Sequence, residues 1–469
     1  MGDVQILLPS LAFLVFTLIQ GGGDRELQFS GLGGQHPVLT AHSNRHRGGE
    51  QMRRIMTKVM VVLLILLVVA VSPLLACGKK KAVEEQPIII GSLTDLSGVV
   101  PAQGREASAG ELDAVRYINE VQGGIGGVQV ELITKDIKYN STLGTQAYAD
   151  LQSTYGSRLR AVVSFITPGL LPNKDSFVAD KVIGFGSADP LSELPFDQYW
   201  TFSSICFYNV AFDAATTYLI DHWSGSGKPV VGLVATTVNA AKVISGGIKS
   251  ACDREGVTYL AKLGDPTALD RTVDLTTLKD AGANIVFLIL SESGVIKALK
   301  DSRQMGLNAT FAGLKSYATA SFATAAGSDG EGMYCVIDTA SWEETDVEGI
   351  QFLRDWNAEW HPEVTFRSPQ YILSFVDVLT VAEAMRRAID KVGYSKLDGD
   401  AIKEALEGMT DWNPMSLMAP LKFGPDRHSG GTAVRLCQLQ SGQWKAATDW
   451  LTTRELSGQE LTLSYYQGL

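Results

Sequence analysis

The sequence predicts an α/β protein built from two doubly wound parallel-sheet lobes, joined by a hinge that the chain crosses more than once. Short apolar segments rich in β-branched residues alternate with helical segments from residue 88 to about 190, and the alternation repeats from about 209 to 314. Strands that alternate with helices form parallel sheets covered on both faces. Two longer helical stretches and a strand-rich end follow, which suggests that the chain returns to the first lobe.

The first lobe begins with the segment PIIIGSLTDLSG, in which a Gly/Ser/Asp turn ends a β-branched run. In the next segment Ala109, Leu112, Val115 and Ile118 recur at helical spacing, and a Gly-Gly pair ends the helix. We expect the later elements of this lobe to be strands at 128–136, 160–167 and 181–190 and helices at 142–155 and 171–180.

The second lobe repeats this order. We expect its helices at 209–223, 240–256, 276–282 and 293–307 and its strands at 229–237, 257–263, 283–291 and 309–314. A strand at 332–338, helices at 346–360 and 368–393 and a strand-rich segment at 419–447 follow. We therefore assign residues 88–205 plus 333–420 to the first lobe and residues 206–332 plus 421–469 to the second.

Composition excludes several classes of function. The chain has 469 residues, 45% of them hydrophobic, which suffices for packed cores in two or three domains. Its 51 acidic and 40 basic residues give a net charge of -11, so we expect no nucleic-acid partner. The five cysteines include no Cys-x-x-Cys pair, and the body of the chain is poor in histidine. We expect neither a metal nor a cofactor.

Residues 52–77 have the parts of a secretory signal. Arg53, Arg54 and Lys58 precede an apolar run at 59–71, and the segment ends in Leu-Leu-Ala-Cys. This ending resembles the lipobox of bacterial lipoproteins, which implies that Cys77 is lipidated and becomes the first residue. The alternative is a transmembrane anchor, because the apolar stretch is almost long enough to span a bilayer. The charged residues 78–87 would then form a tether to the membrane.

Residues 1–51 do not resemble a domain. An apolar run at 4–19 contains Pro9 and lacks a basic start, and a Gly-, His- and Arg-rich stretch without periodicity follows. We interpret the segment as an extension that is not made, with Met52 or Met56 as the true start; the alternative is an additional transmembrane segment. Any peptide from before Met52, found by mass spectrometry, would contradict the first interpretation.

Enzyme motifs are present only in the wrong context. The glycines of GGIGG at 123–127 end a helix, whereas the dinucleotide fingerprint follows a strand and opens a helix. In SGSGKP, Pro229 replaces the Ser or Thr that a phosphate loop requires. Ser187 has no nucleophile elbow around it. We therefore predict that the protein is not an enzyme.

Ligands of parallel sheets bind beyond the carboxyl ends of the strands. With two lobes, these ends can face each other across a cleft. The candidate loops span residues 97–104, 167–169, 186–190, 236–240, 291–294 and 314–318.

The segments IIIGSLTDLSG, GELDAVRYINEVQGGIGGVQVELITKD and PLKFGPDRHSGG together resemble the branched-chain amino acid type of periplasmic substrate-binding protein, within the type I periplasmic binding protein family. LKDSRQMGL and GEGMYCV support the resemblance, which extends from Ile88 to about Trp450. It implies three hinge crossings, a small amino acid or small carboxylate as ligand, closure of the lobes around it, and delivery to an ABC permease with its ATPase subunits. It also implies a place on the extracytoplasmic face of a bacterial cell envelope.

The resemblance also implies contact residues. The loop that offers hydroxyls and amides to a ligand carboxylate corresponds here to Thr167, Pro168 and Gly169, and the next contact loop corresponds to Ser187, Ala188 and Asp189, although small polar residues in loops more often only form turns. The remaining candidates are Ser97, Gln103, Tyr208, Asn239, Ser291, Glu292, Lys315 and Tyr317, of which the two tyrosines would wall an apolar side chain unless they belong to the core.

Lys315 departs from the family pattern. Amino acid binders carry a glutamate at this place to pair with the ligand ammonium, and a lysine there would repel it. One interpretation is that Glu292 or Asp189 substitutes; another is that the ligand is an anion attracted by Lys315. A third is that Lys315 is one position off and points to solvent, as most lysines do.

Two other functional classes remain open at this point. A sensor module would pass ligand occupancy to a signalling partner instead of a permease, and neighbouring genes would discriminate between the two. An enzyme on the same scaffold would need a catalytic constellation, which the sequence does not display.

Overall fold

The computed structural model describes residues 86–187 and 198–455. The predictions for residues 1–51, for the signal segment at 52–77 with Cys77, and for most of the tether lie outside the described residues. The same holds for Ala188 and Asp189.

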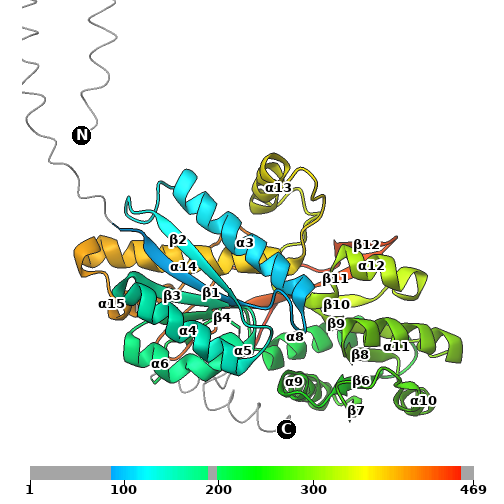
Figure 1. Ribbon diagram of the computed structural model, residues 1–469. Helices are drawn as coiled ribbons and strands as arrows, with labels where there is room; N and C mark the ends of the chain where they lie inside the picture. Colours follow the sequence, from blue (N-terminus) through cyan, green and yellow to red (C-terminus); the bar gives the residue numbers. More distant parts are fainter. Residues whose placement is uncertain (1–85, 188–197, 456–469) are drawn as a thin grey trace, which may run out of the picture. The chain divides into compact units, whose positions relative to one another are not determined.

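The first lobe is built on a five-stranded parallel sheet in the order β2-β1-β3-β4-β5 (Figure 1). Every residue of β1 is buried, because helices cover both faces of the sheet, and this explains the unbroken apolar run in the sequence. The strands are β1 (Ile88–Thr94), β2 (Val130–Asp136), β3 (Leu159–Ser164), β4 (Ile183–Gly186) and β5 (Thr201–Phe202).

Helix α14 (Pro369–Val392) belongs to this lobe although it is distant in sequence, since it packs along α3 (Pro101–Glu120) (Figure 1). Gly110 permits the close approach: a methyl group there would lie 2.2 Å from the Tyr371 carbonyl oxygen. The Tyr371 hydroxyl donates to Asp113 of α3 at 2.7 Å. The other helices of this part are α4 (Ser141–Tyr155), α5 (Thr167–Leu170), α6 (Lys174–Asp180), α13 (Glu348–Trp360) and α15 (Gly399–Glu407).

The second sheet has eight strands, in the order β12-β11-β10-β9-β8-β6-β7 with β13 paired to β11. Strands β6 to β10 run parallel, and β11 joins β10 in the antiparallel sense. The strands are β6 (Val230–Thr236), β7 (Thr258–Gly264), β8 (Ile285–Ile289), β9 (Thr310–Leu314), β10 (Tyr334–Ile337), β11 (Ala433–Gln440), β12 (Gln443–Ala446) and β13 (Leu451–Thr452).

Helices α8 and α9 of the second lobe pack against each other through a glycine, as α3 and α14 do in the first. A methyl group on Gly247 would lie 2.1 Å from the Asn209 carbonyl oxygen. The helices of this lobe are α8 (Tyr208–Asp221), α9 (Asn239–Glu255), α10 (Thr272–Asp280), α11 (Glu292–Met305) and α12 (Ala320–Ala326). Short 3₁₀ turns occur at η1 (Gly156–Arg158), η2 (Leu171–Asn173), η3 (Lys315–Tyr317), η4 (Gly327–Asp329) and η5 (Tyr394–Lys396).

The chain passes between the lobes three times: after β5, after β10 and before β11. The first and third crossings lie side by side, because the Ser429 hydroxyl donates to the Ile205 carbonyl at 2.6 Å and a methyl group on Gly431 would lie 2.4 Å from the Cys206 nitrogen. The two-lobed fold with a multi-crossing hinge is as predicted.

One predicted boundary is wrong. We assigned residues 333–420 to the first lobe, but β10 pairs with β9 and β11 in the second sheet. The second crossing therefore begins at Asp338 and not at Met333. The third crossing also comes later than predicted, since the Gly430 amide still donates to the Ser203 carbonyl at the edge of the first sheet.

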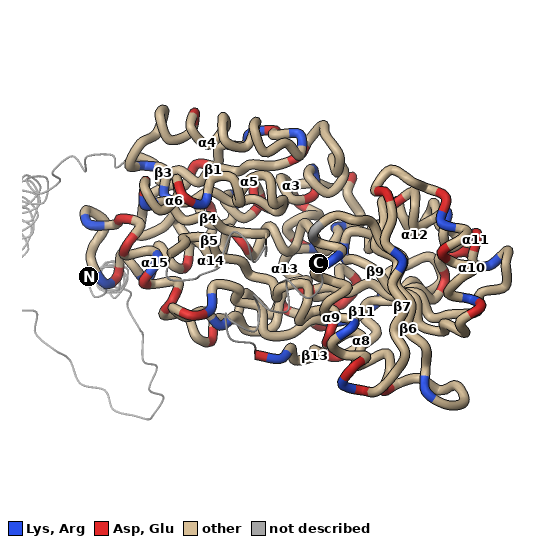
Figure 2. Tube along the Cα trace, turned by 90° about the horizontal axis from the view of Figure 1, so that it is seen from below, with Lys and Arg blue, Asp and Glu red and all other residues tan. Residues whose placement is uncertain are grey.

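Charged residues of both signs are interspersed along the described chain in both lobes (Figure 2). This distribution agrees with the absence of a basic footprint in the composition.

Candidate functional site between the lobes

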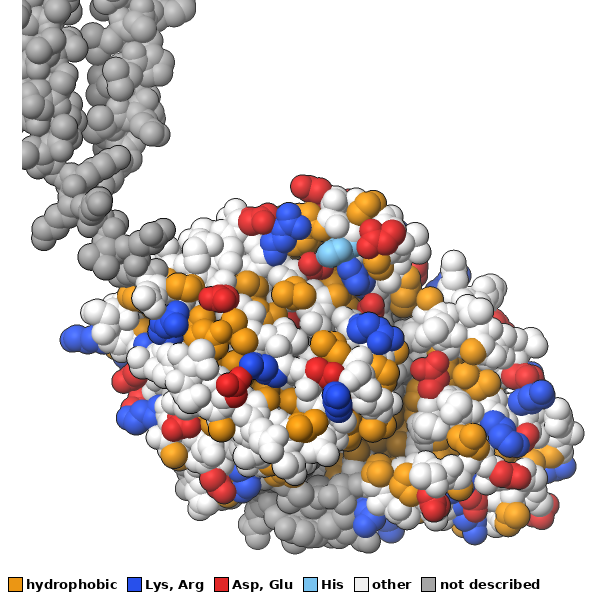
Figure 3. Space-filling view, viewed as in Figure 1, with side chains coloured by type: hydrophobic (Ala, Val, Ile, Leu, Met, Phe, Trp, Pro, Cys, Tyr) orange, Lys and Arg blue, Asp and Glu red, His pale blue; other side chains and the backbone are white. Residues whose placement is uncertain are grey.

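The strand-end loops of the two lobes meet near the hinge. Gln103, in the first turn of α3, donates its side-chain amide to the Ser316 carbonyl of η3 in the second lobe at 3.5 Å. The space-filling view shows the surface hollowed between the two lobes, with hydrophobic side chains at its depth (Figure 3). The predicted cleft thus lies where the carboxyl ends of the parallel strands place it.

Two predicted residues of the first lobe lie together, at the start of α5 and just after β4. The hydroxyl oxygens of Thr167 and Ser187 lie 3.5 Å apart, and both side chains are half-buried. Pro168 and Gly169 are buried, and a methyl group on Gly169 would lie 2.2 Å from the Ser164 hydroxyl oxygen. The predicted loop at 167–169 is therefore a helical turn, in which Pro168 and Gly169 pack inward, whereas the hydroxyls of Thr167 and Ser187 lie side by side.

Ser97 has a structural partner in the loop after β1. Its hydroxyl donates to Asp136 at 2.6 Å, and the same carboxylate accepts the Leu96 amide at 2.9 Å. Slight burial raises the pKa of Asp136, but these hydrogen bonds outweigh it and hold the pKa below its usual value. Ser97 is exposed, so its position agrees with a loop-forming role as well as with ligand contact.

The second-lobe candidates lie at helix starts. Ser291 caps α11 by accepting the Gly294 amide at 3.3 Å, and Glu292 is the first residue of that helix. Partial burial raises the pKa of Glu292 above its ordinary value. Tyr208, half-buried, begins α8; Asn239 begins α9, and its side chain lies outside what the structure describes.

Tyr317 lies in the core of the second lobe, with 2% of its surface exposed. Its hydroxyl donates to the Leu290 carbonyl at 2.6 Å and accepts the Leu290 amide at 3.2 Å, and its ring stacks on Phe322. This position agrees with the interpretation of Tyr317 as a core aromatic rather than as a wall of the ligand site.

Lys315 is buried, so the interpretation that it points to solvent is wrong. Only 9% of the residue is exposed, and its ammonium donates to Asp338 at 2.7 Å. Burial lowers the pKa of Lys315, but the attraction of Asp338 outweighs it, and the pKa lies above the usual value. Because Asp338 starts the second crossing, this ion pair links the end of β9 to the hinge.

Asp377 of α14 extends this cluster into the first lobe, and it was not among our candidates. Burial raises its pKa to about 7; a hydrogen bond with Ser204 and the charge of Lys315 oppose the rise, and the charge of Asp338 adds to it. One of its carboxylate oxygens is buried without a hydrogen-bond partner among the described residues. A polar residue inside the apolar segment SFVDVLTVA was the available signal.

Glu111 of α3 is a second buried acid that we did not predict. Burial raises its pKa to about 8, the hydrogen bond that it accepts from the Ser92 hydroxyl at 2.5 Å lowers it, and Asp377 raises it further. Glu111 is therefore mostly protonated at neutral pH. The hinge cluster, defined as Glu111, Lys315, Asp338 and Asp377, thus places one lysine among three acidic residues, so Lys315 is not an isolated positive charge.

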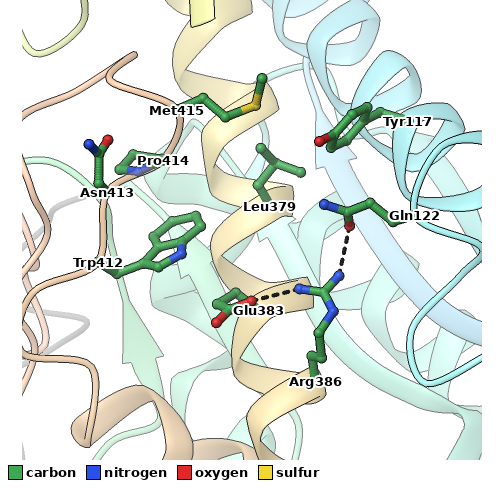
Figure 4. Close-up of a pocket in the computed structure, with 9 residues that line it drawn as sticks. All are labelled: Tyr117, Gln122, Leu379, Glu383, Arg386, Trp412, Asn413, Pro414 and Met415. Carbon is green, nitrogen blue, oxygen red and sulfur yellow. Dashed lines mark hydrogen bonds and ion pairs between the residues drawn. The ribbon is translucent and has the colours of Figure 1, made fainter.

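The described surface also has two hollows away from the strand ends. One, of about 150 Å³, lies between α3, α14 and the segment 412–415 (Figure 4). Trp412 and Met415 face it from one side, while Glu383 and Arg386 pair on α14. The other, of about 350 Å³, lies between α4 and α6.

Among residues 86–187 and 198–455, no group of three or more His, Cys, Asp or Glu side chains is placed to hold a metal ion. Within the same residues, none of the helices combines the length and the apolar character needed to cross a membrane.

Two parallel-sheet lobes, three crossings and facing strand ends define a class of proteins that bind a ligand between lobes and close by hinge motion. The family model described as periplasmic binding protein matches residues 87–443, so the chain belongs to the periplasmic binding protein family. This is a family of binding proteins, and membership implies an extracytoplasmic location.

Solved structures share the fold. A branched-chain amino acid ABC transporter protein from Thermus thermophilus with bound valine is 18% identical, with a TM-score of 0.69 over 79% of this chain and 97% of that one. The substrate-binding protein LivJ from Streptococcus pneumoniae in complex with isoleucine is 18% identical, with a TM-score of 0.64 over 79% and 100%.

A fatty acid ABC transporter substrate-binding protein from Thermomonospora curvata is also 18% identical, with a TM-score of 0.68 over 81% of this chain and 94% of that one. A search of curated proteins found no significant match. At these identities the similarity establishes the fold and leaves the ligand open.

Proposed function

We propose that this protein is an extracytoplasmic solute-binding lipoprotein that captures a small amino acid or organic-acid-like ligand between its lobes and delivers it to an ABC import permease. Membership of the periplasmic binding protein family supports the proposal most directly. The facing loops, with Thr167 and Ser187 on one side and η3 on the other, supply hydroxyls, amides and carbonyls where such a ligand would lie.

The mechanism follows from ligand contacts that exist only when the lobes are close. A ligand that touches both lobes stabilises the closed arrangement by its additional contacts, and the three crossings restrict the motion to a hinge. The permease then distinguishes the closed from the open protein by shape. No bond in the ligand is broken.

The hinge cluster favours a zwitterionic amino acid over a simple anion. The interpretation that Lys315 attracts an anion depended on a free positive charge, whereas its ammonium is paired with Asp338 and lies near Asp377. A lysine that is already paired with an acidic residue offers little attraction to a lone carboxylate. Valine and isoleucine in two structural relatives make branched-chain amino acids the first ligands to test.

A thermal-shift screen of the mature protein tests this function. A ligand that binds only the folded protein raises the melting temperature by mass action, by an amount that grows with its concentration relative to Kd. We expect a shift with leucine, isoleucine or valine and none with short-chain, fatty or aromatic acids. A shift with anions alone would contradict the amino acid assignment. If no compound in the screen shifts the melting temperature, the proposal that the protein binds a small amino acid or organic acid is contradicted.

Lipid attachment at Cys77 is the second part of the proposal. It accounts for the order of a basic segment, an apolar segment and the Leu-Leu-Ala-Cys ending within residues 52–77. We expect metabolic labelling with a fatty acid analogue to mark the wild-type protein and not C77S, and the mature N-terminus to begin at Cys77. A labelled C77S protein, or a mature chain that retains residues before 77, would contradict lipidation.

A further inference from the structure

Cys335 and Cys437 occupy directly opposed positions on neighbouring strands. They are Cα partners in the antiparallel pairing of β10 with β11. Opposed residues project to the same face of a sheet, and here both side chains are buried in the core of the second lobe. Both are free thiols in this structure, and burial together with the neighbouring Cys437 thiol raises the pKa of Cys335.

This placement meets the Cα-separation requirement for a disulfide. Opposed residues of an antiparallel pair have Cα atoms roughly 4.5–5.5 Å apart, and disulfides span Cα separations of roughly 4.4–6.8 Å. The other described cysteines have different surroundings. Cys206 contacts the Thr453 hydroxyl and the Ala433 carbonyl, and Cys252 lies in α9.

We propose that Cys335 and Cys437 form a disulfide bond in the exported protein. The location implied by the family is one in which disulfides form and persist. One thiolate attacks a disulfide of an envelope oxidant, and the second thiolate then displaces that oxidant from the mixed disulfide. The two thiols lose their protons and are oxidised, and the oxidant leaves reduced to a dithiol.

The exchange must take place before the second lobe is complete. Burial raises the pKa of Cys335 well above its usual value, so the folded protein offers almost no thiolate there. During folding, when β11 has not yet covered β10, both thiols are accessible to the oxidant. The bond is then sealed in the core and is resistant to external reductants in the folded protein.

The bond would close a covalent ring that contains the whole segment in which the chain returns to the first lobe. β10 leads directly into the second crossing, and the third crossing leads directly into β11, so α13, α14 and α15 lie inside the ring. A ring of about 100 residues restricts the unfolded chain strongly and stabilises the folded one. The bond would join the strand that leads into the second crossing to the strand that follows the third crossing.

Peptide mapping of the protein exported with its own leader tests the proposal. The protein is quenched in acid, denatured without reductant in the presence of an alkylating reagent, and digested. We expect the peptides with Cys335 and Cys437 to be linked and to separate on reduction, while Cys206 and Cys252 are alkylated. The C252A variant serves as a control in which the linked peptide persists.

Stability supplies a second measurement that does not depend on mapping. We expect reductant to lower the denaturant midpoint of the wild-type protein and of C252A, and to leave that of the double variant C335S/C437S unchanged. If exported wild-type protein contains Cys335 and Cys437 both alkylated, or linked to other cysteines, the proposal is overturned. No ligand is used, so this result is independent of the thermal-shift screen.

Discussion

Ion pairs of similar length lie at very different depths in this protein. Lys315 and Asp338 at the hinge pair at 2.7 Å with side chains 9% and 8% exposed, whereas Lys249 and Asp253 on α9 pair at 2.5 Å with side chains 57% and 62% exposed. A pair of intermediate depth is Arg254 with Asp213, which lie 2.9 Å apart with side chains 36% and 7% exposed. Since the distances are similar, burial decides how much each charge depends on its partner.

The hinge pair should be the most sensitive to the loss of one partner. K315M leaves Asp338 and Asp377 buried without their cation, and an uncompensated buried charge costs about 3–5 kcal/mol. We expect denaturant unfolding to show a loss of stability of this size. K315M/D338L removes both charges and should recover much of it, and a double variant as unstable as K315M would show that packing, not charge, holds this site.

The raised pKa values of the buried acids Glu111 and Asp377 predict that the free energy of unfolding falls as pH rises. The folded protein holds the protons of Glu111 and Asp377 up to pH values of about 8 and about 7, while unfolded carboxyls release theirs near pH 4. The unfolded state therefore binds fewer protons between these values, and the free energy of unfolding falls as pH rises, by up to about 1.4 kcal/mol per pH unit for each group.

Chemical denaturation between pH 5 and pH 8 would measure this slope. E111Q keeps a neutral side chain of similar shape and should flatten the slope, whereas E404Q, at an exposed position on α15, should leave it unchanged. An unaltered slope in E111Q would show that Glu111 is not protonated in the folded protein.

The pair of intermediate depth should give an intermediate effect. D213A removes a nearly buried carboxylate that accepts two hydrogen bonds from the Arg254 guanidinium, each at 2.9 Å, and we expect a loss of about 1–2 kcal/mol. E255A removes a second, more exposed partner of the same arginine and should cost less. If the two variants are equally stable by denaturant unfolding, burial does not rank these pairs.

The exposed pair should contribute least. K249M changes a lysine that pairs with Asp253 one turn along α9, and exposed pairs of this kind are worth no more than about 0.5 kcal/mol. It is the same substitution as K315M, so the two variants compare one chemical change at two depths. A loss in K249M approaching that in K315M would contradict the ranking by burial.

Sequence patterns located most of the elements that position the site. The β-branched runs predicted β1, β3 and β8, because strands covered on both faces are mostly apolar. The rule that ligands bind beyond the carboxyl ends of parallel strands led us to Thr167, Ser187 and Lys315, which lie at the start of α5, after β4 and at the start of η3. Strand β10 was assigned to the wrong lobe, because its residues carry no mark of which sheet edge they will join.

What the sequence determined by itself is local: the periodicity of each segment, the order of strands and helices, and the signal-like segment ending at Cys77. What tertiary structure decided is which distant residues meet. Lys315 is neutralised by Asp338 and Asp377, from the second crossing and from α14, and Cys335 is placed opposite Cys437. Such pairs depend on how the chain crosses the hinge. A hinge crossing produces no periodic pattern in the sequence, so the sequence pattern does not predict these pairs.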